Sequence, residues 1–352
     1  MNTPPKIKGR GAQHNSGNRF LQQTTEISSE YSYEEECSFR DKRTTYLVEH
    51  PKKVINEITS PDLPMGKSVN PYQGCEHGCI YCYARNTHEY FGYSAGLEFE
   101  QKIIVKKNAP ELLEKELNKK SWKPTPILFS GNTDCYQPAE REFELTRQML
   151  QVCLKYRNPV AIITKNALIL RDQDILGEMA KLGLVKVIMS VTTLNENLRR
   201  VLEPRTASAI KRLQVLASLS KNGIPVGVNV APILPGLNDH EIPEIIKAAA
   251  EYGALSASYT IVRLNGSVGE LFEEWIKVSF PNKADKVLKQ IKELHGGTLN
   301  DSQFKRRMRG EGVYAEHIKQ LFHIYRSRHF ADKTMPPFNT SDFQRGGQLN
   351  LF

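Results

Sequence analysis

Six short apolar runs, each followed by a segment of helical periodicity, restrict the fold of this 352-residue chain more than any other feature of its sequence. Most of the runs are rich in Val and Ile, as strands buried on both faces of a parallel sheet usually are. The runs cover residues 68–73, 126–130, 160–164, 185–191, 225–231 and 258–262. Amphipathic segments lie between them, and several end at a glycine. The alternation predicts an α/β fold, and six units rather than eight predict an incomplete, TIM-like (β/α)6 barrel.

The rest of the chain is expected to flank this barrel, which we place at residues 61–265. Residues 1–60 are polar and have little periodicity, so they predict a largely extended or disordered arm. Residues 266–334 have a helical pattern and are expected to close the open side of the barrel. Residues 335–352 are punctuated by Pro and Gly and predict a flexible tail.

A loop directly after the first apolar run contains Cys75, Cys79 and Cys82 in a C-x3-C-x2-C pattern. Iron–sulfur clusters and structural zinc sites usually take four protein ligands. Because no fourth cysteine is close in the sequence, a metal centre on this loop would keep one coordination position open for another molecule. A zinc site completed by His77 or by a distant cysteine is the alternative. A disulfide is disfavoured, because no secretory signal is evident and a chain of this length needs no disulfides to be stable.

The wider string over residues 74–84, with Tyr81 just before the last cysteine, resembles the radical S-adenosylmethionine (SAM) superfamily. Within that superfamily it is similar to the group related to spore photoproduct lyase, a DNA repair enzyme. The resemblance implies that the three cysteines hold a 4Fe–4S cluster and that SAM binds the fourth iron. It also implies that an external electron donor such as flavodoxin or ferredoxin reduces the cluster. Reductive cleavage of SAM would then yield a 5′-deoxyadenosyl radical that removes hydrogen from a substrate.

The resemblance also indicates cofactor-binding residues at the carboxyl ends of the barrel strands. A polar loop after the second strand would bind the SAM ammonium group, and it comprises Ser130, Gly131, Asn132, Thr133 and Asp134. Lys165, after the third strand, would pair with the SAM carboxylate. Ser190 and Thr192 after the fourth strand, Ile233 after the fifth, and Tyr81 complete the expected contacts. The structural alternatives are a polar turn that caps a helix and a lysine at the rim without a partner.

Tyr83 and Cys135 are the residues that we expect to be catalytic. Tyr83 follows the last cluster cysteine, where the photoproduct lyase group carries a tyrosine thought to relay hydrogen. The cysteine that returns hydrogen to the product in that group corresponds to Gly131 here, and Cys135 lies four residues further along. The alternatives are ordinary aromatic packing for Tyr83 and a buried structural thiol for Cys135.

The net charge of +9 favours a polyanionic partner, because phosphate backbones attract clustered Lys and Arg. Basic residues cluster at 305–309 and at Arg326 and Arg328, although a solvated helix face is an alternative explanation. With the resemblance, the charge favours nucleic acid, and DNA in particular, as the substrate. Two other functions remain open: radical modification of RNA or a peptide, and a non-catalytic, clamp-tethered DNA-binding iron–sulfur protein.

The last five residues resemble the short peptide by which bacterial repair and replication proteins bind the sliding clamp. Gln348 would bond at the rim of a pocket, while Leu349, Leu351 and Phe352 would fill an apolar groove. The alternative is a tail that folds back onto its own domain. Because no signal peptide or uninterrupted apolar span is evident, we expect a cytoplasmic protein that does not enter a membrane.

Overall fold

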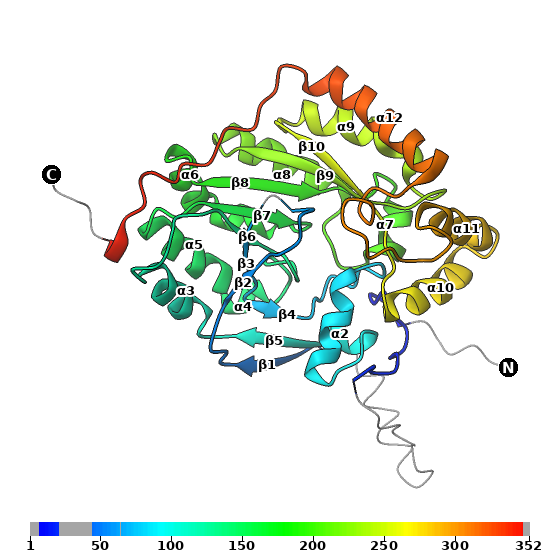
Figure 1. Cartoon of the computed structure of the whole chain (residues 1–352), viewed down its shortest axis with the longest axis horizontal. Helices are drawn as coiled ribbons and strands as arrows, with labels where there is room; N and C mark the ends of the chain where they lie inside the picture. The colour runs from blue at the N-terminus through cyan, green and yellow to red at the C-terminus, as the bar shows by residue number, and fades with distance from the viewer. Residues whose placement is uncertain (1–6, 21–43, 64, 348–352) are drawn as a thin grey trace, which may run out of the picture.

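A partial β/α barrel forms the centre of the computed structural model, which describes residues 7–20, 44–63 and 65–347 (Figure 1). Seven strands form one sheet in the order β10-β9-β8-β7-β6-β3-β2. Six of them are parallel, and β2 pairs antiparallel with β3 at one edge. They are β2 (Ile55–Glu57), β3 (Lys67–Val69), β6 (Ile127–Phe129), β7 (Val160–Thr164), β8 (Val185–Ser190), β9 (Val226–Ile233) and β10 (Ala257–Ile261). The predicted incomplete barrel is confirmed.

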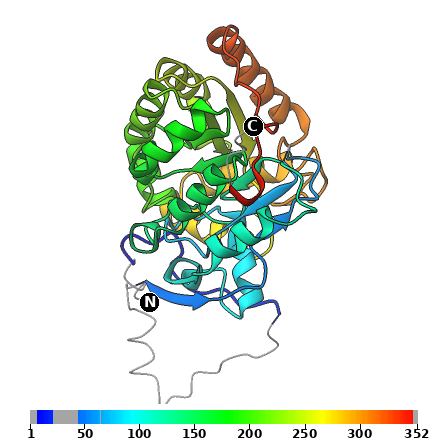
Figure 2. The same cartoon turned by 90° about the vertical axis from the view of Figure 1, so that its left-hand side faces the viewer.

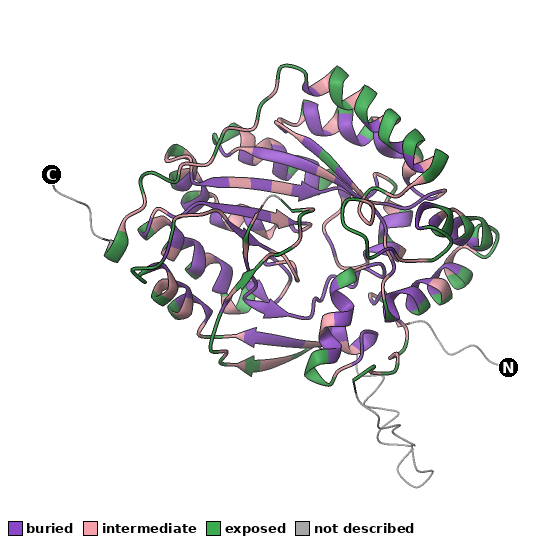
Figure 3. Cartoon of the chain, in the orientation of Figure 1, coloured by how far each residue is buried: buried purple, intermediate pink, exposed green. Residues whose placement is uncertain are grey.

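Helices cover the outer face of this sheet and bury the main core against it (Figure 3). In β8, Val185, Val187 and Met189 are at most 1% exposed, whereas Lys186 and Ile188 between them are partly exposed. This alternation places every second residue of the strand on the helix-covered face. The helices are α3 (Ala109–Leu117), α4 (Glu140–Phe143), α5 (Leu145–Lys155), η2 (Ala167–Asp172), α6 (Gln173–Lys181), α8 (Ala209–Lys221), η3 (Asp239–Glu241) and α9 (Ile242–Glu251). In contrast, α7 (Glu196–Leu202) lies at the carboxyl ends of the strands and packs in a second core with helices of the C-terminal region.

The first predicted strand is divided between two sheets. Its beginning is β3 of the barrel, whereas Tyr72–Gln73 form β4 of a smaller sheet with the order β1-β5-β4. Pro71 lies at the division, because its nitrogen cannot donate a ladder hydrogen bond, and its carbonyl accepts from Lys106 N at 3.0 Å. The other strands of this sheet are β1 (Thr45–Glu49) and β5 (Lys102–Lys106). The smaller sheet thus holds the chain that leads into the cysteine loop.

The described part of residues 1–60 differs from the predicted extended or disordered arm. Residues 7–20 lie against α2 (Leu97–Gln101), where the amides of Gly11 and Ala12 donate to the Glu100 carboxylate at 3.1 and 2.8 Å. Arg10 Nη1 also donates to the Glu100 carbonyl at 2.6 Å. Further along, β1 is a strand of the smaller sheet and β2 is a strand of the barrel sheet. Residues 7–20 are held in place because their amides donate hydrogen bonds to the buried Glu100 carboxylate. Such a contact joins residues far apart in the chain, so no periodic pattern in the sequence predicts it.

The C-terminal helices lie on two sides of the barrel. Figure 1 shows α10 (Ser267–Ser279) and α11 (Ala284–Leu294) near the carboxyl ends of the strands, while α12 (Gly312–Phe330) lies beside α9. The helix that follows the cysteine loop, η1 (Tyr83–Phe91), packs against α10. Within the described residues, no helix is long and apolar enough to cross a membrane.

The described part of the predicted flexible tail runs along the amino ends of the barrel strands, on the side that Figure 2 shows. Asn339 N donates to the Gly183 carbonyl at 2.9 Å, and Gln344 N donates to the Tyr156 carbonyl at 2.9 Å. A short turn, η4 (Arg345–Gly347), ends the described chain. Residues 348–352, with the clamp-like motif, lie outside the described residues, as does Cys37.

Candidate functional site

The three cysteines lie on one loop between β4 and η1. Cys75 and Cys79 are 7% and 8% exposed, and Cys82 is half-buried. Gly78, between them, has a φ of +68°, and a Cβ at this position would lie 2.8 Å from a carboxylate oxygen of Glu100. The loop therefore requires glycine here, both for its backbone conformation and for the space next to Glu100.

The thiols of this loop are in surroundings that oppose their ionisation. Burial is the main cause that raises the pKa of all three thiols, and it brings that of Cys75 to about 12. A bound metal centre supplies the positive charge that makes such thiols ionise, because coordinated thiols are deprotonated. The three donors thus suit a metal centre better than free, reactive thiolates.

The geometry favours an iron–sulfur cluster over zinc. Among the described residues, no three His, Cys, Asp or Glu side chains converge on a point where one metal ion could bind. A cubane cluster has no such requirement, since each cysteine binds a different iron. His77, the alternative zinc ligand, has its Nε2 3.0 Å from Asn166 Nδ2 and its Nδ1 3.4 Å from Asp134 Oδ2. Both of its ring nitrogens therefore already have partners.

The loop after β6 binds the backbone on both sides of Cys75. Thr133 Oγ1 donates to the Gly74 carbonyl at 2.6 Å, and Gln137 Nε2 donates to the same oxygen at 3.0 Å. The Glu76 amide in turn donates to Gln137 Oε1 at 3.0 Å. Sequence analysis did not identify Gln137, because a glutamine near the start of a helix carries no signal of such a contact.

We expect Gln137→Ala to lower the free energy of unfolding by about 1–3 kcal/mol, because it removes a partner from the Gly74 carbonyl and from the Glu76 amide inside the protein. Urea denaturation of the anaerobically purified protein measures the change. Gln148→Ala, which alters an exposed side chain bonded to the Phe143 carbonyl, is the matched control and should cost less than about 0.5 kcal/mol. Equal, small effects of the two substitutions would contradict this role of Gln137.

Asp134 does not have the free carboxylate that the predicted ammonium site requires. Its Oδ1 accepts from Thr164 Oγ1 at 2.7 Å, and its Oδ2 accepts from the Lys165 amide at 2.8 Å. The second oxygen also lies 3.4 Å from His77 Nδ1. Asp134 thus connects the end of β7 to the cysteine loop, which is a positioning role that only the folded chain shows.

The other members of the predicted ammonium site lie next to Asn70. Its Oδ1 accepts from the amides of Asn132 and Thr133 at 2.8 and 3.4 Å. Ser130 has a φ of +77°, and its Oγ accepts from the Cys135 amide at 2.9 Å. Two backbone amides of this loop and the hydroxyls of Ser130 and Thr133 are therefore used to shape it, while its backbone carbonyls are the groups suited to an ammonium.

A buried ion pair lies under the cysteine loop. Arg212 Nη2 is 2.5 Å from Glu203 Oε2, and both side chains are at most 1% exposed. The Tyr81 hydroxyl donates to Glu203, and Thr192 Oγ1 lies 2.6 Å from Glu203 Oε1. Arg212 Nη1 donates to the Ser190 carbonyl at 3.0 Å. Tyr81 and Thr192, predicted SAM contacts, thus direct their hydroxyls into this network, and Ser190 contributes its carbonyl to it.

The charge of this network is stable over a wide pH range. Burial by itself raises the pKa of Glu203, but Arg212 and then Lys165 outweigh that effect and hold the pKa at about 2. Glu203 therefore remains ionised at neutral pH although water does not reach it. Glu203 thus makes the central contacts of this network.

Lys165 and Ile233 are placed differently from each other. Lys165 Nζ lies 5.9 Å from the centre of the Tyr81 ring, and no described carboxylate is within ion-pair distance of it. This ammonium is consistent with the predicted contact to the SAM carboxylate. Ile233, in contrast, is 1% exposed and packs in the main core. Its side chain is therefore not placed to form the surface on which adenine was expected to pack.

The two predicted catalytic residues, Tyr83 and Cys135, differ in their exposure to solvent. Tyr83 is 45% exposed, its hydroxyl donates to the Gly131 carbonyl at 2.6 Å, and the Arg263 guanidinium lies 5.2 Å from its ring centre. Cys135 is 0% exposed and packs in the main core. The structure thus corresponds to the alternative of a structural thiol for Cys135, because a hydrogen donor must reach the substrate.

Arg85 is a further residue of the site that sequence analysis missed. It is fully buried on η1, where Nε donates to the Cys79 carbonyl at 3.0 Å and Nη2 pairs with Glu100 at 2.5 Å. Arg85 thus connects the middle of the cysteine loop to α2 and, through Glu100, to the amino-terminal segment. A single arginine in a helical pattern does not signal such a role.

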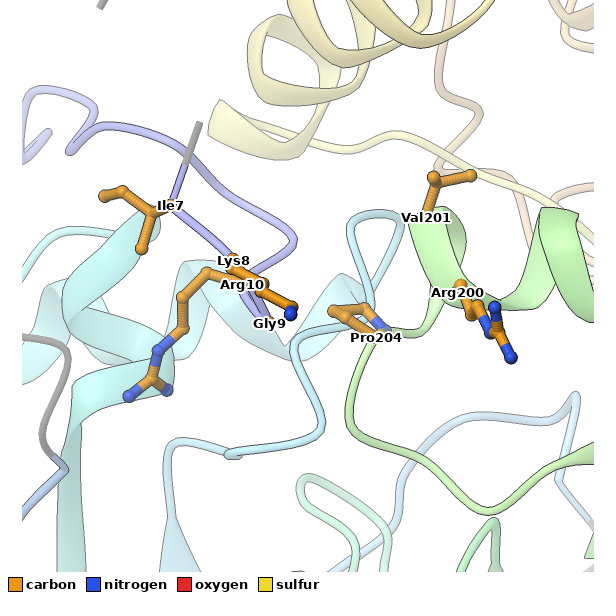
Figure 4. Close-up of a pocket in the computed structure, with 7 residues that line it drawn as sticks. All are labelled: Ile7, Lys8, Gly9, Arg10, Arg200, Val201 and Pro204. Atoms are coloured by element: carbon orange, nitrogen blue, oxygen red, sulfur yellow. The ribbon is translucent and has the colours of Figure 1, made fainter. Parts of the chain in front are cut away.

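A cavity of about 340 Å³ lies beside this loop, between the amino-terminal segment and the end of α7 (Figure 4). It is lined by Ile7, Lys8, Gly9, Arg10, Arg200, Val201 and Pro204. Arg10 is engaged with the Glu100 carbonyl and with Thr44, at 2.6 and 3.3 Å. The cavity includes none of the three cysteines, so it is separate from the candidate cluster site.

Comparison with known proteins agrees with this geometry. Residues 69–249 match the family model of the radical SAM superfamily. An uncharacterized protein of Mycobacterium tuberculosis is 30% identical over 247 residues, covering 69% of this chain and 72% of that protein. An uncharacterized protein of Methanocaldococcus jannaschii is 30% identical over 230 residues, covering 65% and 82%. Spore photoproduct lyase complexed with dinucleoside spore photoproduct has a similar fold, with a TM-score of 0.60, 16% identity and coverage of 81% and 80%.

Proposed function

Because the chain belongs to the radical SAM superfamily, whose members use a 4Fe–4S cluster and SAM, we propose that it is an enzyme that cleaves SAM reductively and acts on a lesion in DNA. The observation that carries the first part is the loop with Cys75, Cys79 and Cys82 at the carboxyl edge of a six-unit parallel barrel. Cys75, Cys79 and Cys82 would hold the cluster, which when bound would supply the one-electron reduction of SAM that hydrogen abstraction from a substrate requires. The protein binds, orients and shields these reactants.

Each protein group has a defined task in this proposal. The three thiols hold the cluster, and Gln137, Thr133 and Arg85 fix the backbone that carries them. The carbonyls of residues 130–133 accept the SAM ammonium, while Lys165 pairs with its carboxylate. Since Cys75 and Cys79 are buried, water has limited access to this side of the loop, which would protect a radical from side reactions.

DNA as the substrate is supported by the placement of Tyr83. It lies next to Cys82, is half exposed, and contacts the loop after β6 through the Gly131 carbonyl. Arg263, over its ring, offers a cation on the same surface. A solved neighbour of the same fold is complexed with a dinucleoside photoproduct, and another has SAM bound as well. The overall charge of +9 agrees with a polyanionic substrate.

Anaerobic protein reconstituted with iron and sulfide, reduced with dithionite and mixed with SAM tests the proposal. Ultraviolet-irradiated DNA, undamaged DNA, RNA and a mixed peptide library are offered in turn, each deuterated, and deuterium in 5′-deoxyadenosine is measured. Deuterium transfer from irradiated DNA alone supports a DNA lesion as the substrate. Transfer from RNA or peptide would support the corresponding alternative. A cluster that releases no 5′-deoxyadenosine when SAM is added would indicate a non-catalytic iron–sulfur protein.

Tyr83→Phe is expected to leave the fold and SAM cleavage intact but to lower product formation by about 100-fold, the lower end of what a positioned side chain that transfers a proton contributes. The substitution removes the hydroxyl that donates to Gly131 and keeps the ring under Arg263. The ratio of product to 5′-deoxyadenosine is the measurement. Tyr90→Phe, on the exposed end of the same helix, is the control, and equal ratios in both variants would argue against a role for the Tyr83 hydroxyl.

A further inference from the structure

A groove on the edge of the barrel is lined by basic side chains. It has a volume of about 460 Å³ and lies between edge strand β10 and helix α12. The lining residues are Ala257, Ser258, Tyr259, Arg309, Lys319, Phe322, His323 and Arg326. Four of these side chains are Arg, Lys or His, and none is Asp or Glu. A concave surface of this composition attracts anions.

Three basic side chains of the groove are arranged in a row along α12. Lys319, His323 and Arg326 are separated by four and three residues, so they share one face of the helix, and all three are exposed. They extend over about 10 Å, at 1.5 Å per residue. One phosphate group is too small to contact the whole row. A polymer with a phosphate at each unit matches it better.

Arg309 and two aromatic residues form the floor of the groove. Arg309 Nη1 donates to the Tyr259 carbonyl at 3.0 Å, and its guanidinium lies 4.1 Å from the Tyr259 ring centre. The Tyr259 and Phe322 rings are 4.6 Å apart. Arg309 is thus held in place by a neutral carbonyl and a ring. Lys319 Nζ lies 3.1 Å from Glu316 Oε2, an exposed pair that a phosphate could compete for. No carboxylate among the described residues forms an ion pair with Arg309 or Arg326, so their charges are available to an anion.

Two further arginines connect the groove to the surroundings of Tyr83. Arg307 is two residues before Arg309 and pairs with Asp62, with Arg307 Nε 2.6 Å from Asp62 Oδ2. Burial and then the nearby charge of Arg307 lower the pKa of Arg263, which lies over the Tyr83 ring. Arg309 of the groove is therefore linked to Tyr83, beside the cysteine loop, through Arg307 and Arg263, of which Arg307 has its charge paired.

We propose that the groove between β10 and α12 binds successive phosphates of the nucleic-acid strand whose damaged nucleotide occupies the active site. This inference rests on the proposed function and adds a second contact, away from the reacting nucleotide. It means that the enzyme acts on a strand several nucleotides long. Binding there depends on salt rather than on sequence, because backbone contacts release counterions and do not read bases.

The test compares two double variants that lose the same charge. Lys319→Gln with Arg326→Gln removes two cations from the groove, and Lys181→Gln with Lys221→Gln removes two exposed lysines at the ends of α6 and α8. Fluorescence anisotropy with a labelled single strand of about 12 nucleotides measures Kd over a range of salt concentrations. The groove variant should bind about tenfold more weakly or worse at low salt, and its slope of log K against log salt should be smaller by about 1.4, since each single-strand phosphate contact contributes about 0.7.

The control variant should retain the slope of the parent protein. Equal slopes for the groove variant and the parent would overturn the proposal. Competition by inorganic phosphate or ATP as strong as competition by the unlabelled strand would also overturn it, because the groove would then be a site for a small phosphorylated molecule.

A second measurement separates this inference from the proposed function. Release of 5′-deoxyadenosine is compared for a lesion in a dinucleotide and for the same lesion in a long strand. The groove variant should lose activity at subsaturating concentrations of the long strand only, by about the fold-change seen in Kd. Equal loss on both substrates would overturn the groove proposal. No release with any nucleic acid, by the parent protein as well, would overturn the function while the anisotropy result still decides the groove.

Discussion

Cys79→Ala is expected to reduce SAM cleavage to the level of the reaction without protein and to prevent stable iron binding. Cys79 is one of only three thiols on the loop, and no group of three His, Cys, Asp or Glu among the described residues offers another metal site. Two thiolates cannot hold a cubane that already lacks a fourth protein ligand. Iron and sulfide content, the visible absorption of the reconstituted protein and 5′-deoxyadenosine release are the measurements.

The matched control for this experiment is Cys153→Ala. Cys153 is 0% exposed in α5, and burial raises the pKa of its thiol, so it serves as a small apolar side chain of the core. This variant should keep the iron content and the activity of the parent protein. Iron binding and SAM cleavage by Cys79→Ala at half the parent level or more would exclude the proposed cluster site.

Arg212→Met is expected to lower the free energy of unfolding by about 3–5 kcal/mol, because it leaves Glu203 as a buried charge without its main partner. Arg212 also donates to the Ser190 carbonyl and to Thr206 Oγ1, at 3.0 and 2.6 Å, so both would lose a donor. Denaturation in urea at pH 7 measures the change. Arg200→Met, which shortens a largely exposed side chain on α7, should cost less than about 1 kcal/mol.

The pH dependence gives this prediction a second readout. In the parent protein Glu203 has a pKa of about 2 against an ordinary value of 4.5, so its ionised form stabilises the fold above pH 4.5, and this contribution is lost as the pH falls toward 2. Without Arg212, burial should raise the pKa of Glu203 above 4.5. Stability of the variant should then decrease as the pH rises from about 4.5 to 7, a slope that the parent lacks.

Adding Glu203→Gln to Arg212→Met should recover part of the lost stability, because the unpaired buried charge is gone. The double variant should also lose the pH slope. The free energies of unfolding of the double variant, Arg212→Met and Glu203→Gln are therefore compared. If the effects of the two single substitutions simply add in the double variant, the two residues do not act as a pair.

Periodic patterns predicted the parts of this protein that depend on neighbours in the sequence. The six strands were found because buried parallel strands are continuously apolar, and β7 has the predicted bounds of 160–164. The loop of Cys75, Cys79 and Cys82 was found for a similar reason, since cluster ligands are close in the chain. Lys165 follows the last residue of β7 and Tyr83 follows the last cysteine of the loop, so the positions of both in the fold were accessible from the sequence, whereas their roles stay predictions.

The sequence by itself therefore determined the barrel, the cysteine loop and the side of the barrel that carries the candidate site. Only the tertiary structure decided which polar groups remain free for ligands: Asp134 and Thr192 are used by neighbours, Cys135 and Ile233 are in the core, and Arg212, Gln137 and Arg85 support the loop. The physical reason is that local periodicity reports which face of an element is buried. Partners for a buried charge or carbonyl come from residues far apart in the chain, and no local pattern records them.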